Sequence, residues 1–412
     1  MSDSATDLRT AATTAHRALA PDLARGVMLL LIAVANIPWY LWGSRPSDST
    51  VHPAGEGGPD RIAAVVTIVA VDFRVYPMFA FLFGYGMVQF ARSRRARGVP
   101  ERRVRRMLRR RHWAMIAIGA AHAALLFFGD VVSAYGLAGL VLVFLFFARR
   151  TVTVLVWASL GLLALGALTA LAVFGAWATD AGHVPAEAGG SPPGWAIWAS
   201  TLAVNGNPDY LATITERLGM WASVALAQGL LLPIVPVCIL LGMVAASSQV
   251  LEEPHRHRPL LWTTAIVGIT IGWAGGAYAA AGYLGLLGWS QDSWYAVMMI
   301  ALCTGLPCGL GYVAVFGLLA DRLRTTPAVL QPVVEVGRRS LTCYLGQSVI
   351  FAPLLCAWGL GVGGWLSSAG AVLVAVLTWL ALLVFATWLA RTGRRGPAEV
   401  VLRRLTYGPS PQ

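Results

Sequence analysis

The stretch GAAHAALLFFGDVVSAYGLAGLVLVFLFF, residues 119 to 147, decides the fold. An unbroken helix from Trp113 to Ala148 would be about 54 Å long at ~1.5 Å per residue, whereas a hydrocarbon core is roughly 30 Å thick. The chain must therefore turn, and Gly129-Asp130 is the only punctuation available. We predict two antiparallel transmembrane helices joined there, with Asp130 at a membrane face and His122 inside the bilayer, about two turns below it.

An ionisable side chain at that depth is costly unless it is paired or solvated, so it often marks a pathway or a reaction site. His122 is therefore the first candidate for a catalytic residue, and Asp130 is the second. Two structural readings stay open. His122 can hydrogen-bond a neighbouring helix in its neutral form, and Asp130 can cap the N-terminus of the second helix.

The composition predicts an all-α, polytopic integral membrane protein, because 57% of the residues are hydrophobic and 12% are charged. The net charge of +12 does not indicate nucleic acid, since arginines cluster between Arg92 and Arg111, directly after an apolar run, as the positive-inside rule predicts. The five cysteines lie in apolar runs without metal-ligand spacing, so we expect no metal site. No cleavable signal peptide is apparent.

The apolar runs predict about ten transmembrane helices in a single membrane domain, residues 1–412. The spans are expected at about 23–42, 61–90, 113–128, 131–148, 152–177, 220–246, 260–286, 294–320, 340–361 and 367–390, the sixth kinked near Pro233 and Pro236. The arginine distribution predicts that both termini lie in the cytoplasm. It makes the N-terminal tail 1–21, the arginine-rich segment 91–112 and the tail 391–412 cytoplasmic, and the loop 178–216 extracytoplasmic. We expect segment 91–112 to be an amphipathic helix against the headgroups.

Polar residues at two of these spans have local interpretations. Asp22 and Arg25 are three residues apart at the inner end of the first span, so they can pair on one helix face, and Asn36 lies deeper on the same helix. Asp72 and Arg74, with Pro77, are expected to break the run 61–90. An Asp-Arg pair at a shifted membrane boundary is favoured slightly over an intramembrane site.

Four blocks carry a resemblance to a family: DLARGVMLLLIAVANI, FAFLFGYG, HAALLFFGDVVSAYGLAGL, and VGRRSLTCYLGQSVI with the tail RRGPAEVVLRRLTYG. In this order and spacing they resemble the YeiB-like bacterial inner-membrane proteins, domain-of-unknown-function family 418. The resemblance spans nearly the whole chain.

The resemblance implies an architecture similar to integral-membrane acyltransferases, in which a membrane-embedded histidine is catalytic and an acyl group moves from cytosolic acyl-coenzyme A to an acceptor across the membrane. His122 matches that histidine. The family's polar positions fall on Asp22, Arg25, Asn36, Arg74, Asp130, Arg338, Thr342, Tyr344 and Gln347. The candidates for substrate binding among them are Asp22, Arg25, Asn36, Arg74, Arg338, Tyr344 and Gln347. Of these, Arg338, Tyr344 and Gln347 suit a groove for substrate or a phosphate-bearing donor, although helix-helix hydrogen bonding is the commoner role of Thr342 and Tyr344.

The function expected from the sequence is acyl transfer from an acyl-coenzyme A donor to an extracytoplasmic glycan or a lipid-linked acceptor, with His122 as general base or acyl carrier. The rivals are a transporter that uses His122 in a proton or substrate path, and a non-catalytic scaffold or lipid-binding protein. Membrane lipids are the expected partners, and the oligomeric state is left open. His255 and His257 lie beside Glu252 and Glu253 in a loop that reads as solvated rather than metal-binding.

Overall fold

A computed structural model describes residues 19–47, 49–183, 193–287, 294–323 and 326–407. Within these residues the chain is helical, without strands. The α-helices are α2 (Leu19–Asn36), α3 (Gly58–Ala70), α4 (Val75–Arg95), α5 (Glu101–Leu125), α6 (Val131–Leu145), α7 (Thr151–Asp180), α8 (Pro193–Asn205), α9 (Ala212–Leu226), α10 (Ile234–Ser247), α11 (Arg258–Tyr283), α12 (Trp294–Arg322), α13 (Gln331–Arg338), α14 (Ser340–Leu355), α15 (Ser368–Arg391) and α16 (Pro397–Tyr407).

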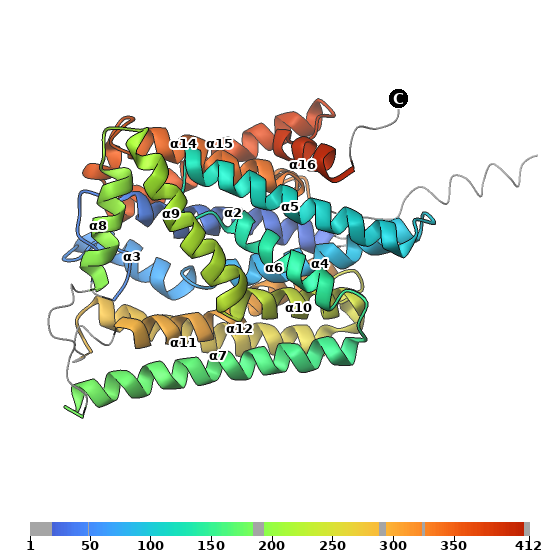
Figure 1. Cartoon of the computed structure of the whole chain (residues 1–412), viewed down its shortest axis with the longest axis horizontal. Coiled ribbons are helices and arrows are strands. Elements are labelled where there is room, and N and C mark those ends of the chain that lie inside the picture. Colours follow the sequence, from blue (N-terminus) through green and yellow to red (C-terminus); the bar gives the residue numbers. More distant parts are fainter. Residues whose placement is uncertain (1–18, 48, 184–192, 288–293, 324–325, 408–412) are drawn as a thin grey trace, which may run out of the picture.

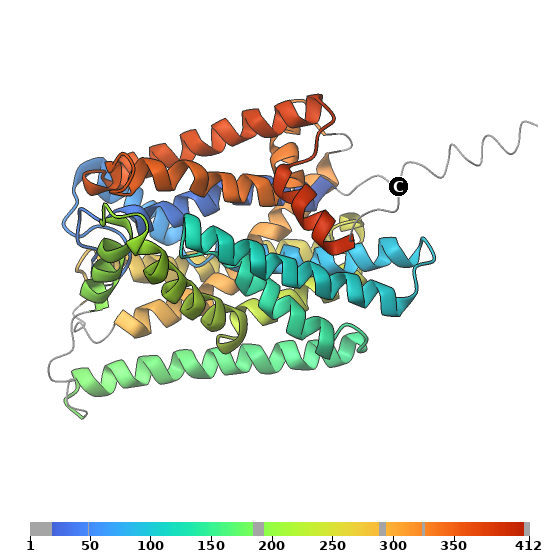
Figure 2. The same ribbon diagram turned by 45° about the horizontal axis from the view of Figure 1, so that its top comes forward.

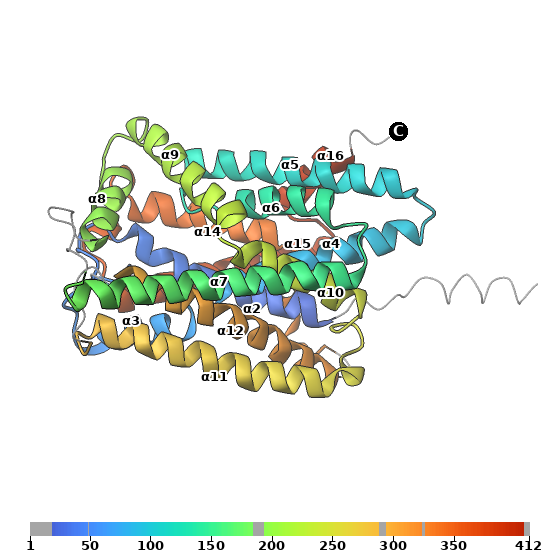
Figure 3. The ribbon, with the colours of Figure 1, turned by 60° about the horizontal axis from the view of Figure 1, so that its bottom comes forward.

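Most of the long helices lie side by side along the long axis of the molecule, whereas α8 runs across one end (Figure 1). Helix α2 lies inside the bundle, since 67% of its most apolar stretch is buried. Helix α7 lies on the outside, since only 17% of its most apolar stretch is buried. Figure 3 shows α7 crossing the front of the bundle. Glycines allow α11 and α12 to pack closely: a Cβ at Gly268 would lie 2.2 Å from the carbonyl oxygen of Pro307.

By length and composition, six helical stretches of the described chain can cross a membrane, and a seventh is the bent pair α9 and α10. The bend of 51° follows a π-helical turn and Pro233, so the predicted kink is confirmed. The predicted spans at 113–128, 131–148 and 340–361 correspond to the second half of α5, to α6 with 15 residues and to α14 with 16 residues. The total of ten spans and the orientation of the termini stay predictions.

The arginine-rich segment 91–112 forms a helical hairpin rather than one helix on the membrane surface. Helix α4 ends at Arg95, Gly98 turns with φ +73°, and α5 starts at Glu101. Nε of Arg95 and a carboxylate oxygen of Glu101 are 2.8 Å apart across this turn. Figure 2 shows the hairpin extending beyond the other helices at one end of the bundle.

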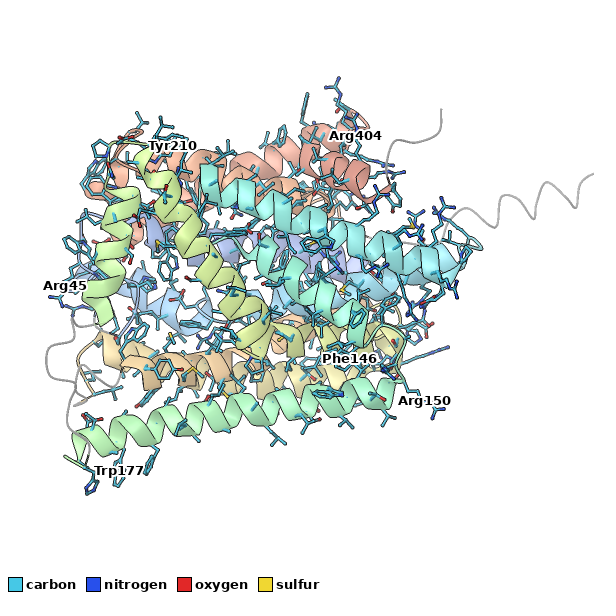
Figure 4. The ribbon with its side chains drawn as sticks, viewed as in Figure 1. Arg45, Phe146, Arg150, Trp177, Tyr210 and Arg404 are labelled. Atoms are coloured by element: carbon cyan, nitrogen blue, oxygen red, sulfur yellow. The ribbon has the colours of Figure 1, made fainter. Side chains whose placement is uncertain are left out.

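Other arginines also lie toward the end of the bundle that carries the helical hairpin. In Figure 4, Arg150 and Arg404 lie toward the end with the hairpin, and Arg45, Trp177 and Tyr210 lie toward the other. We call these the arginine-rich end and the opposite end. The predicted tail 391–412 contains α16, which packs against α5 and α14. Likewise, α2 already begins at Leu19 within the predicted tail 1–21, and the predicted loop 178–216 contains α8 and the start of α9.

The run 61–90 breaks where the sequence indicated, at residues 71–74, with Phe73 at φ +61°. Pro77 lies in the first turn of α4, where its missing N–H removes no helical hydrogen bond. The prediction that Asp72 and Arg74 form an ion pair is wrong. The Asp72 carboxylate is 2.8 Å from Nε2 of His52, and the guanidinium of Arg74 donates to the backbone oxygen of Asp72 instead.

Candidate functional site

His122 and Asp130 form a buried pair at the connection between α5 and α6. Nδ1 of His122 lies 2.9 Å from Oδ1 of Asp130, and both side chains are almost completely buried. The other carboxylate oxygen accepts a hydrogen bond of 2.8 Å from the backbone N–H of Ser133. Asp130 is thus both the N-cap of α6 and the partner of His122. The predicted separation of two turns is wrong, because His122 lies in the last turn of α5 and the connection folds back beside it.

The contact with Asp130 defines which ring nitrogen of His122 can act as a base. A carboxylate only accepts hydrogen bonds, so Nδ1 is the donor in this contact, and in a neutral imidazole Nε2 is then the nitrogen with the lone pair. Nε2 is buried and has no hydrogen-bond partner among the described residues. An imidazole oriented by a carboxylate through one nitrogen, with the other free, is the arrangement of a general base.

A large cavity of about 980 Å³ opens at the arginine-rich end. Its lining includes five arginines: Arg25, Arg92, Arg97, Arg111 and Arg338. At its inner limit it reaches Phe79, Val132 and Tyr344. The ring of Tyr344 is edge-on to His122, with centroids 5.5 Å apart, and its hydroxyl accepts from the backbone N–H of Val131. Tyr344 therefore lies between this inner cavity and His122.

A second cavity, of about 330 Å³, lies on the other side of the pair. Gly129 and Val131, the neighbours of Asp130, line this outer cavity, whereas Val132 lines the inner one. Asn36, Asp72 and Arg74 are among the residues around the outer cavity, although Arg74 is 0% exposed, and most of its other lining residues are apolar or aromatic. His122 and Asp130 themselves line neither cavity, but residues next to them line both, so the pair is packed in the wall between the two.

Three of the sequence-derived candidates meet at the mouth of the inner cavity. Nη1 of Arg25 is 3.4 Å from Asp22, which confirms the predicted pair, and Nη2 donates to the carbonyl of Leu82. Asp22 is also 3.5 Å from Nε of Arg338, which lies 2.6 Å from Glu335 through Nη1. One carboxylate on α2 therefore holds two cavity arginines from different helices.

Two further candidates connect helices and do not line either cavity. The amide of Gln347 donates 2.7 Å to the carbonyl of Leu29, which joins α14 to α2. The hydroxyl of Thr342 donates 2.5 Å to Glu399 on α16. Both contacts are of the helix-joining type that the sequence offered as the alternative to substrate binding.

Comparison with known proteins finds one family match and two similar bacterial proteins. Residues 245–409 match the family described as "Protein of unknown function (DUF418)". The chain is 28% identical over 367 residues to the uncharacterized protein YxaH of Bacillus subtilis (strain 168), which covers 84% of this chain and 83% of that protein. It is 25% identical over 406 residues to the uncharacterized protein YeiB of Escherichia coli (strain K12), covering 93% and 95%. The DUF418 match and the similarity to YxaH and YeiB over most of the chain agree with the family resemblance of the sequence.

The matched residues include Arg338 and Tyr344, which line the inner cavity, and Gln347, which joins two helices. His122 and Asp130 lie outside the matched residues, so their role is argued from geometry alone. Arg25 and Arg74 also lie outside the matched residues.

Sequence reasoning missed Glu252 as a site residue, because it placed Glu252 in a solvated loop. Glu252 lines the inner cavity, where it accepts hydrogen bonds from Tyr85 and, at 2.9 Å, from Gln89, and it lies 3.4 Å from Arg92. The three partners follow one face of α4 at intervals of four and three residues, and this spacing is the signal that was available. Burial raises the pKa of Glu252 to about 7.

Proposed function

We propose that this protein is a membrane-embedded acyltransferase of the bacterial cytoplasmic membrane. It moves an acyl group from a cytosolic acyl-coenzyme A type of donor to an extracytoplasmic or lipid-linked acceptor. The observation that carries the proposal is the position of the His122–Asp130 pair between an arginine-lined cavity and a largely apolar one. A group that must receive reactants from two sides is best placed in such a wall.

The inner cavity has the charge and size for the donor. Its five arginines offer forked donors that suit phosphate groups, of which a coenzyme A thioester carries several. Its volume lies at the top of the range of roughly 300–1,000 Å³ that is usual for sites of small organic ligands. The positive-inside rule favours the cytoplasm for the arginine-rich end, which is where the donor is made available.

The reaction needs one base, which His122 supplies. Nε2 takes the proton of the acceptor hydroxyl or amine as that oxygen or nitrogen attacks the thioester carbonyl carbon. Asp130 stabilises the imidazolium through Nδ1. When the C–S bond breaks, the imidazolium returns the proton to the leaving thiolate, so the products are the acylated acceptor and the free thiol. His122 can also carry the acyl group transiently, with the same overall balance.

Access to Nε2 requires a movement at the wall. Nε2 is enclosed in this structure, and the ring of Tyr344 lies between it and the inner cavity. Rotation of the Tyr344 side chain is the smallest change that connects the donor cavity to His122. Buried tyrosine rings of this kind are suited to act as a gate, because only side-chain torsions have to change.

The test is turnover of labelled acetyl-coenzyme A by purified protein in lipid nanodiscs. We expect His122→Gln to lower turnover by about two to four orders of magnitude, because glutamine forms hydrogen bonds but does not titrate near neutral pH. His112→Gln is the matched control, because His112 is also buried on α5 but pairs with no carboxylate of the described residues. Equal turnover by the His122 variant and the control would overturn the catalytic assignment.

A proton-coupled transporter is the rival function, since a titratable pair between two cavities also suits a proton path. The same experiment separates the two. A transporter neither hydrolyses acetyl-coenzyme A nor becomes labelled by it, and it would instead move protons in sealed vesicles in a manner sensitive to His122→Gln.

A further inference from the structure

The last turn of α5, which carries His122, is held by two side chains from a distant segment. Nε of Arg217 on α9 donates 3.0 Å to the carbonyl of Ala124. The hydroxyl of Tyr210, in the turn before α9, donates 3.0 Å to the carbonyl of Leu125. The last carbonyls of a helix have no partner within the helix. Both contacts therefore satisfy acceptors that the end of α5 would otherwise leave open.

The charge and the packing of Arg217 suit this position. The side chain is 1% exposed, and Cζ of its guanidinium lies 4.8 Å from the centroid of the Tyr210 ring. The Tyr210 ring is in turn edge-on to Trp358, with centroids 4.9 Å apart. A cation is favoured on the face of an aromatic ring, and also at the C-terminal end of a helix, where the peptide dipoles gather partial negative charge. The end of α5 and the tyrosine ring together therefore accommodate the buried charge.

The segment that these two contacts hold leads directly into the His122–Asp130 pair. The carbonyl of His122 accepts from the N–H groups of Leu126 and Phe127, at 2.8 and 3.1 Å, so the chain turns immediately after α5. Asp130 follows as the N-cap of α6. Helix α9 packs against both α5 and α6 (Figure 1). A shift of the last turn of α5 would therefore move His122 relative to Asp130.

The same face of α9 also forms part of the outer cavity. Met220 and Val224 follow Arg217 by three and seven residues, so the three side chains share one face of the helix. Met220 and Val224 line the outer cavity, and no residue of α9 lines the inner one. One helix therefore contributes both to the wall of the cavity opposite the donor and to the support of the proposed base.

We propose that Arg217 is a positioning residue for His122. Through the carbonyl of Ala124 it fixes the last turn of α5, and with this turn it fixes the approach of His122 to Asp130. Tyr210 supports the same turn through the carbonyl of Leu125. The effect on the position of the pair concerns the folded structure alone, whereas its consequence for acyl transfer rests on the proposed function.

The experiment compares variants in lipid nanodiscs by hydrogen-deuterium exchange and by turnover of labelled acetyl-coenzyme A per folded molecule. We expect Arg217→Gln to speed amide exchange in residues 120–130 about tenfold and to lower kcat about 10- to 100-fold, because a small misplacement of a catalytic group is costly. The KM for acetyl-coenzyme A should stay level, since α9 does not line the inner cavity. Arg217→Lys should recover most of the kcat, because an ammonium can still donate to the carbonyl of Ala124.

Arg61→Gln is the matched control. Nε of Arg61 also donates to a backbone oxygen, that of Glu56, but Arg61 is exposed on α3. If Arg217→Gln does not fold, Tyr210→Phe decides, because it removes only the hydroxyl that donates to Leu125, and it should show the same changes to a smaller extent.

Three outcomes are decisive. Exchange of residues 120–130 at the rate of the Arg61→Gln control would overturn the support of α5 by α9. Faster exchange together with the kcat of the control would overturn the positioning role of Arg217. Faster exchange in a protein whose wild type does not turn over acetyl-coenzyme A would overturn only the proposed function and would support the contact between the two helices.

Discussion

Gly119 packs directly against the carboxylate of Asp130: a Cβ at this position of α5 would lie 2.1 Å from Oδ2 of Asp130 and 2.1 Å from the hydroxyl oxygen of Ser133. The carboxylate has little freedom to move, because His122 holds one oxygen and the N–H of Ser133 holds the other. Gly119 therefore determines how closely α6 approaches α5, and through this approach it positions the pair.

Gly119→Ala should separate Asp130 from His122. We expect a loss of stability of about 1–3 kcal/mol from the overpacking and a drop in acetyl-coenzyme A turnover of at least tenfold. Thermal unfolding and turnover are measured together. Gly166→Ala on α7 is the control, because a Cβ there meets nothing within 4 Å. A Gly119→Ala protein with the turnover of the control would contradict the close packing.

Asp130→Asn separates the two roles of this residue. The asparagine oxygen can still cap α6 by accepting from the N–H of Ser133, so we expect a small change in Tm. It cannot stabilise an imidazolium as a carboxylate does, so turnover should fall by about two to four orders of magnitude. Asp130→Ala, which removes the cap as well, should lower the Tm further. Full turnover by Asp130→Asn would leave Asp130 with a structural role only.

Local patterns in the sequence predicted much of the fold. The turn at Gly129-Asp130, the break at residues 71–74, the kink at Pro233 and the Asp22–Arg25 pair all depend on residues close together in the chain. Each follows from helix length, from proline or from spacing on one helix face. The long α7 and the clustering of arginines at one end followed from composition in the same way.

Contacts between distant segments could not be predicted from the sequence. His52 lies in a loop before α3, and only the fold brings it to Asp72. Glu252 follows α10 and returns to α4 across 160 residues of sequence separation from Arg92. Even the contact of His122 with Asp130 depends on how the five residues between α5 and α6 fold back, which helix periodicity does not describe. The two cavities arise from such contacts, so the sequence could name candidates but could not place them in one wall.

Glu252 should give the inner cavity a pH dependence near neutrality. Its pKa is raised to about 7 because burial disfavours the charged form, and the long contact with Arg92 does not offset this burial. The folded protein then holds the proton more tightly than the unfolded chain, so this carboxyl contributes stability below about pH 4.5 that is lost as the pH rises to about 7. Ionisation also adds a negative charge to a cavity proposed for an anionic donor.

We therefore expect Glu252→Gln to raise the Tm relative to wild type above pH 7 and to have little effect at pH 5. The affinity for acetyl-coenzyme A should fall between pH 6 and 8 in wild type and stay level in Glu252→Gln. Glu216→Gln is the control, because Glu216 is an exposed carboxylate on α9 that does not line the cavity. Parallel pH profiles for wild type and Glu252→Gln would show that Glu252 does not titrate in this range.

Glu399 fastens the C-terminal helix over the inner cavity. One oxygen accepts from the N–H groups of Leu341 and Thr342, at 2.8 and 3.1 Å, and the other accepts from the hydroxyl of Thr342. Glu399 thus caps α14 from a different helix, and it also lines the cavity. Glu399→Ala should cost about 1–2 kcal/mol and make α16 a faster target for protease. Glu216→Ala, at an exposed carboxylate on α9, is the control, and equal proteolysis of the two variants would contradict the fastening role.

The orientation of the molecule in the membrane decides which reactant each cavity can receive. Since arginines gather at one end of the bundle, the positive-inside rule predicts that this end faces the cytoplasm. Reporter fusions after residues 100, 255 and 330 should therefore report the cytoplasm, and fusions near residues 50 and 190 should report the outside. A periplasmic signal at residue 100 would place the arginine-lined cavity outside the cell. A cytosolic acyl-coenzyme A could not reach it there, and the proposed direction of acyl transfer would fail.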